Sequence, residues 1–162
     1  MSNPTDILLT AARAVKDGAG SDGFAQVLDR AEQPDDFPAL MLIRRDDTIS
    51  QQPERGGGPI DGEGRVEAVI FHPVRTVDTS DGTETEFSQS DIDALFQALL
   101  YELFREDPVD PDTGAARPQA RAPLAKVRRI VRGYRSNVGR ECYTLGFELR
   151  FPHTSVTPQP LS

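Results

Sequence analysis

The sequence contains no tryptophan and only one cysteine, Cys142, among its 162 residues. A single cysteine excludes an internal disulfide and a cysteine-rich zinc site. The opening residues, MSNPTD, are neither basic nor apolar enough for a signal peptide. No apolar run approaches the roughly 20 residues that a membrane-spanning helix requires. We therefore expect a protein that has no membrane association and is kept in a cytoplasm-like compartment.

Residues suited to nucleophilic catalysis are also scarce. A thiol nucleophile with a histidine base would need Cys142 beside His72 or His153. No nucleophile signature surrounds Cys142, which the strand pattern places on an outward-facing position. We expect an ordinary strand cysteine and no catalytic residue.

Two further stretches lack the pattern of a ligand site. In the acidic stretch DTSDGTETE, placing Gly82 at the sixth position of a calcium loop puts Val77 first and Ser88 twelfth, where acids are required. The glycines at 56–58 are not followed by the Lys-Ser/Thr pair of a phosphate loop. We expect a solvated acidic turn, a polar loop, no bound metal and no cofactor.

The main regular feature is the segment 88–104, SQSDIDALFQALLYELF. Its apolar residues recur at helical spacing, which predicts an amphipathic helix with one face buried against a sheet. A second, narrower stripe follows Asn3-Pro4 and predicts a helix that ends at Gly18 or Gly20.

Strands are predicted around these helices at 24–28, 38–45, 65–77, 126–134 and 141–151. The segment 38–45 is apolar on both faces, which favours a central place in the sheet. The mixed pattern of 126–134 predicts a bulge near Arg128 and Arg129. In 141–151, alternation turns five apolar side chains to the core (Tyr143, Leu145, Phe147, Leu149 and Phe151).

The order of elements predicts a single α+β domain over residues 1–162, with a mixed or antiparallel sheet of four to five strands and two helices packed on one face. Long loops are expected at 46–64 and 107–124, and an irregular tail at 152–162. The residues from Thr79 to Phe87 are predicted to form an acidic turn region.

Charge is distributed unevenly along the chain, whose net charge is −8. From Ala116 to the end the net charge is +7, whereas the first 115 residues carry −15. This asymmetry suits either a nucleic-acid surface or two complementary faces that meet in an assembly. The candidate subunit-interface or polyanion-facing residues are Arg117, Arg121, Lys126, Arg128, Arg129, Arg132, Arg135 and Arg140.

The layout resembles the tail terminator (tail completion) proteins of long-tailed bacteriophages. The resemblance runs from about residue 5 to residue 152 in the order PALMLIRRDD, GRVEAVIFHPV, SDIDALFQALLYELF and CYTLGFELRF. It implies a non-enzymatic virion protein, assembled in the host cytoplasm, whose subunits form a ring, expected as a hexamer, at the head-proximal end of the tail.

In that family the ring caps the tail tube and joins it to the head. The implied partners are further copies of the chain, tail-tube proteins and neck or connector proteins, with DNA passing through the lumen without sequence-specific binding. Two alternatives stay open. One is another phage neck or head–tail connector protein, and the other is a small nucleic-acid-binding module that uses the basic 117–140 stretch.

Overall fold

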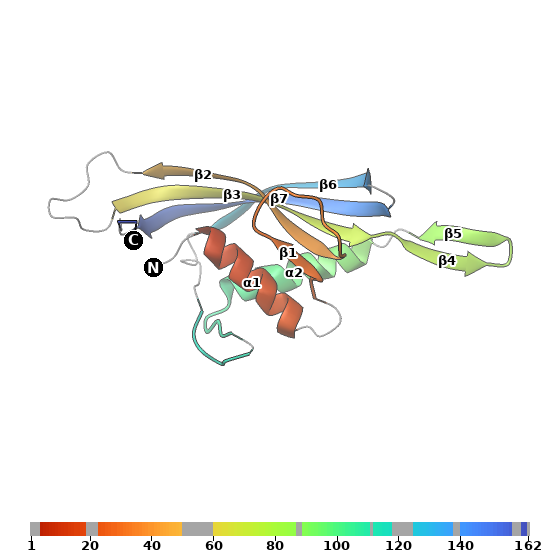
Figure 1. Ribbon diagram of the computed structural model, residues 1–162, viewed down its shortest axis with the longest axis horizontal. Helices are drawn as coiled ribbons and strands as arrows, with labels where there is room; N and C mark the ends of the chain where they lie inside the picture. Colours follow the sequence, from red (N-terminus) through yellow and green to blue (C-terminus); the bar gives the residue numbers. More distant parts are fainter. Residues whose placement is uncertain are drawn as a thin grey trace.

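The computed structural model describes residues 4–18, 23–49, 60–86, 89–110, 112–117, 125–137, 140–156 and 160–161. In chain order the elements are α1 (Pro4–Gly18), β1 (Gln26–Leu28), β2 (Ala39–Ile49), β3 (Ile60–Pro73), β4 (Arg75–Thr79), β5 (Gly82–Glu86), α2 (Gln89–Phe104), β6 (Lys126–Asn137) and β7 (Arg140–Val156). Figure 1 shows α1 and α2 together under one face of a long, twisted sheet.

The main sheet has five strands in the order β1-β2-β3-β7-β6. The short β1 runs parallel to β2, and every other neighbouring pair in this sheet is antiparallel. The α+β prediction, with a mixed five-stranded sheet and two helices on one face, is confirmed. Strand β2 lies between β1 and β3, as its two apolar faces indicate.

The core lies between the helices and the inner face of the sheet. Helix α2 buries Leu95, Phe96 and Leu99, and the Phe96 ring meets Phe147 of β7 edge-on, with centroids 5.1 Å apart. The narrower α1 stripe is buried in the same cluster, as predicted (Ile7, Leu8, Ala11, Ala12 and Val15). Alternation along β7 also holds, because its odd-numbered residues from 143 to 151 pack into this core.

Strand β6 contains the predicted bulge. Its pairing with β7 shifts between Arg128, opposite Glu148, and Val131, opposite Gly146. Arg129 within this bulge has a φ of 52°, in the left-handed region that non-glycine residues seldom occupy. The extra residue brings the Arg129 guanidinium to Glu148, on the face of the sheet opposite the helices.

Strands β2, β3 and β7 extend into segments that were predicted as a loop and a tail, so both predictions were wrong in extent. Within the loop expected at 46–64, β2 continues to Ile49 and pairs with β3 as far as Gly62, and residues 50–59 lie outside the described part of the chain. The tail expected from residue 152 continues as β7 to Val156, opposite Ile60. These extensions are polar and charged, so pairing with a neighbouring strand defines them where hydrophobic alternation does not.

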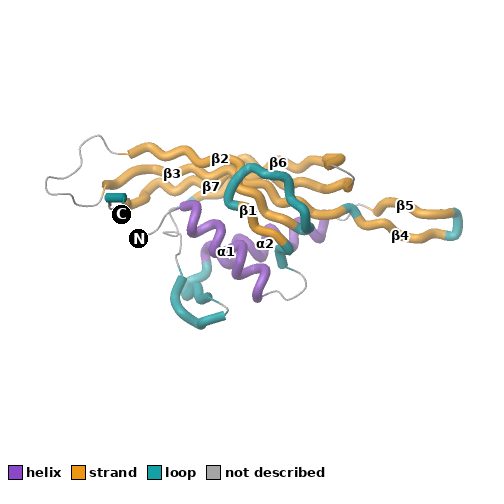
Figure 2. The backbone as a smooth tube through the Cα atoms, viewed as in Figure 1, coloured by secondary structure: helices purple, strands orange, loops and turns teal. Residues whose placement is uncertain are grey.

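The expected acidic turn at 79–87 is instead half of a hairpin. Strands β4 and β5 pair from Arg75 opposite Glu86 to Thr79 opposite Gly82. Ser80 and Asp81 connect the two strands, and Gly82 beside them has a φ of 132°, which glycine adopts readily. The two strands form a sheet separate from the five-stranded one. Figures 1 and 2 show this hairpin extending well beyond the end of the main sheet.

Candidate assembly surfaces

Arg117 of the predicted basic stretch lies inside the subunit, with 7% of its surface exposed. Its Nε donates to the carbonyl oxygen of Val109 at 3.1 Å, and a terminal nitrogen donates to the carbonyl oxygen of Glu102 at 3.0 Å. It also pairs with the Glu102 carboxylate. Burial lowers the pKa of the Arg117 guanidinium, and Glu102 opposes that shift. Arg117 therefore fixes the segment after α2 and is not part of the surfaces described below.

Two further cations of the stretch pair with acids of the same subunit. Arg132 pairs with Asp93 of α2, on the helical side of the sheet. Arg129 lies with its Nε 3.3 Å from Glu148 Oε2. Arg132 with Asp93 and Arg117 with Glu102 thus join the basic part of the chain to its acidic part within one subunit, whereas Arg129 and Glu148 both belong to the basic part.

Lys126 and Arg128 remain as the exposed cations of the stretch without a described ion-pair partner. Both lie at the start of β6, with Lys126 opposite Arg150 and Arg128 opposite Glu148. Among the other predicted residues, Arg121 lies outside the described residues. Arg135 and Arg140 belong to described strands, but their side chains do not belong to the described part.

The sheet face opposite the helices, called here the outer face, has three zones. At the end nearest the hairpin, Cys142 is buried with Ala39 and Phe71, and Phe37 from the β1–β2 connection packs on them. The Phe37 and Phe71 ring centroids are 6.5 Å apart. Cys142 thus lies in a small apolar cluster, as expected for an ordinary strand cysteine.

Cys142 and His72 lie on opposite faces of the sheet. His72 pairs with Tyr143, which packs toward the helices, whereas Cys142 belongs to the outer cluster. His72 Nδ1 lies 2.9 Å from the carbonyl oxygen of Pro73. The two side chains therefore do not form a thiol–imidazole pair, and the side chain of His153 lies outside the described part of the chain.

The second zone is a groove, called here the outer groove, with a volume of about 220 Å³. Ile43 of β2 and Val131 of β6 border it and are 42% and 66% exposed. Its lining residues are Ile43, Glu67, Ala68, Val69, Arg129, Val131, Gly146, Phe147 and Glu148. Gly146 allows the opening, since no side chain stands between Val69 and Val131 there. Exposed apolar residues gathered in one groove indicate a surface suited to another protein segment.

Glu148 forms one wall of the outer groove, and only 3% of its surface is exposed. Its Oε1 lies 3.6 Å from a terminal nitrogen of Arg65, and Oε2 lies 3.3 Å from Arg129 Nε. Oε2 accepts no hydrogen bond from any residue that the structure describes. Glu148 is thus held by two ion pairs, and its Oε2 at the groove wall can accept a further hydrogen bond.

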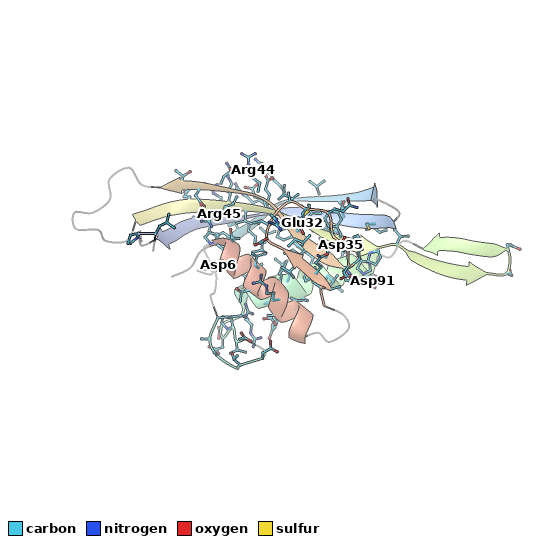
Figure 3. All side chains as sticks on the ribbon, in the orientation of Figure 1. Asp6, Glu32, Asp35, Arg44, Arg45 and Asp91 are labelled. Carbon is cyan, nitrogen blue, oxygen red and sulfur yellow. The ribbon has the colours of Figure 1, made fainter. Side chains whose placement is uncertain are left out.

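The third zone is a charged cavity of about 270 Å³ toward the far end of the sheet. Arg44 pairs here with Asp46, and Arg150 pairs with Glu63. Figure 3 shows Arg44 on the outer face and its neighbour Arg45 turned toward the helices, where Arg45 donates to Thr5 of α1. The cavity is lined by Asp46, Thr48, Glu63, Arg65, Arg128, Arg129, Glu148 and Arg150.

The sequence did not reveal the outer groove or the buried state of Glu148. Alternation correctly placed Glu148 on the outer face, but its burial depends on Arg65 from β3 and on the bulged Arg129 from β6. The hairpin had a usable signal in Asp81-Gly82 and the surrounding threonines, which the acidic-turn interpretation set aside.

The described residues contain no cluster of three or more His, Cys, Asp or Glu side chains that could hold a metal ion. None of the helices in that part of the chain is long and apolar enough to cross a membrane. The sequence matches no protein-family model and no curated protein.

Proposed function

We propose that this chain is a structural virion protein that forms a ring at the head-proximal end of a phage tail, ends the tail tube and joins it to the head. The observation that supports this most is the β4–β5 hairpin, which extends beyond the main sheet as a separate two-stranded unit. A two-stranded hairpin alone is marginally stable in water. Such an arm suits a subunit that completes its structure by contact with another protein.

The two ends of the subunit differ in a way that suits repeated, head-to-tail contact. The hairpin carries four acids (Asp78, Asp81, Glu84 and Glu86) and one base, Arg75. Lys126 and Arg128, which make no ion pair with a described residue, lie toward the other end of the sheet. Unlike surfaces on identical chains associate head to tail and produce closed rings when the rotation per subunit allows closure.

The nucleic-acid-binding alternative has less support from the side chains. Arg117, Arg129 and Arg132 are each paired with an acid of the same subunit. Neutralising a series of phosphates requires cations that are not already paired. The described part of the basic stretch offers only Lys126 and Arg128 for that purpose. DNA passing through a ring lumen requires no such binding surface.

The test is the size and shape of the purified protein, measured by light scattering and by electron microscopy of stained particles. We expect a ring with a central opening, and shortening of tail-tube polymers when the ring is added to tail-tube protein from the same phage. A protein that stays monomeric at all concentrations, or a ring that leaves tube length unchanged, would overturn the proposal. Binding of DNA by the monomer with a steep salt dependence would replace it with the nucleic-acid module.

A further inference from the structure

We propose that the β4–β5 hairpin of one copy binds the outer groove of the next copy, beside Arg128 and Lys126. This inference rests on the proposed function, because it names the contact that would repeat around the ring. It commits to one occupant of the groove, a second copy of this chain.

The hairpin of the same copy does not reach this site. It begins after Pro73, which pairs with Cys142 on β7, whereas Arg128 pairs with Glu148. Six residues of β7 separate those two positions, which is about 20 Å at the rise of a β-strand. Figure 1 shows the hairpin continuing away from the sheet, so it points away from its own groove. A hairpin that occupies the groove must therefore come from another molecule.

The charges of the two surfaces are complementary. Residues 75–86 carry four acids and one arginine, a net charge of −3. Arg128 is exposed, lines the charged cavity and makes no ion pair with a described residue. Lys126 lies on the same strand two residues earlier. Arg128 lines the charged cavity that adjoins the groove and shares Arg129 and Glu148 with it, so an acidic strand pair in the groove would lie near this cation.

The groove also offers the two other kinds of contact that a hairpin needs. Its exposed apolar border, Ile43 and Val131, suits the one large apolar residue of the hairpin segment, Val77. Glu148 Oε2 accepts no hydrogen bond from the described residues. The hairpin segment supplies hydroxyl donors from its threonines and its serine. The groove therefore combines an apolar border with a carboxylate that can accept a further hydrogen bond, and the cation Arg128 lies in the adjoining charged cavity.

The experiment mixes two variants that each carry one added cysteine and treats them with a short bismaleimide cross-linker. One variant has Ser80→Cys at the exposed hairpin turn, and the other has Val131→Cys at the groove. The native Cys142 is buried and stays in place. The control replaces Val131→Cys with Tyr101→Cys, which is 63% exposed on α2. We expect the 80–131 pair to cross-link at least about tenfold faster than the 80–101 pair, because proximity within an assembly raises the effective concentration.

A second comparison tests the charges. Adding Arg128→Glu to the Val131→Cys protein should slow the 80–131 cross-link, whereas Arg13→Glu on the exposed side of α1 should not. Equal rates for the two cysteine pairs in a protein that still forms rings would overturn this inference and leave the proposed function standing. Absence of any assembly in the wild-type protein would overturn both.

Discussion

Arg117 and Glu102 join the segment that follows α2 to the end of that helix. The Arg117 guanidinium pairs with the Glu102 carboxylate and donates to two backbone carbonyls, those of Glu102 and Val109. Ala116, beside Arg117, forms an isolated bridge with Val109. Asp110 accepts from the backbone of Asp112 and Thr113 within the same turn. The long loop predicted at 107–124 is therefore held to the end of α2 over its described residues.

Arg117→Met should destabilise the subunit by about 3 kcal/mol. This is the lower part of the range for breaking a buried ion pair, because Glu102 keeps partial exposure and its contact with Arg105. Denaturant unfolding measures the change. The matched control is Arg105→Met, which removes a more exposed partner of the same carboxylate and should cost less than about 1 kcal/mol. Equal effects of the two substitutions would contradict the anchoring role of Arg117.

The bulge in β6 should respond unusually to glycine. Arg129 has a φ of 52°, where glycine is favoured over alanine by about 1 kcal/mol. Arg129→Gly and Arg129→Ala both remove the contact with Glu148. The difference between their unfolding temperatures therefore reports the backbone conformation at residue 129. We expect the glycine variant to be the more stable of the two in thermal unfolding. In a regular strand the alanine variant would be the more stable of the two. An alanine variant that is more stable than the glycine variant would therefore show that the left-handed conformation is absent.

The sequence predicts those elements whose side chains alternate between apolar and polar environments. Helix α2, strand β7 and the bulge near Arg128 were predicted from such patterns. The ends of β2 and β3 were missed, because residues such as Thr48 and Glu63 are held by cross-strand pairing, which a single chain segment does not display. The outer groove was missed for the same reason, since Ile43, Val69 and Val131 come from three strands.

The helix–sheet core should be sensitive to loss of volume. Leu99→Ala or Phe147→Ala should destabilise the subunit by about 2 to 5 kcal/mol, because both side chains are buried between α2 and the sheet. Gln97→Ala, on the exposed side of the same helix, is the control and should change stability by less than about 0.5 kcal/mol. Unchanged thermal unfolding of either core variant would show that the helix does not pack here.

Reversal of charge should separate association from folding. Arg128→Glu should weaken assembly. Because this reversal places an acid opposite Glu148, Arg128→Gln, which removes only the charge, is the variant expected to leave subunit stability nearly unchanged. Arg132→Glu places two acids together at Asp93 and should instead lower subunit stability. The assembly defect of Arg128→Glu should be larger at low salt, where repulsion is least screened. Sedimentation at two ionic strengths measures it, and an unchanged particle at low salt would exclude Arg128 from the interface.

The central claim is that the hairpin holds the subunits of a ring together, and light scattering of a hairpin-deleted protein tests it most directly. Replacing residues 75–86 with a short Gly-Ser connection removes β4 and β5 and leaves the five-stranded sheet intact. We predict a multimeric wild-type protein and a monomeric deletion variant that unfolds at nearly the wild-type temperature. A wild-type monomer, or a deletion variant that assembles as the wild type does, would contradict the account.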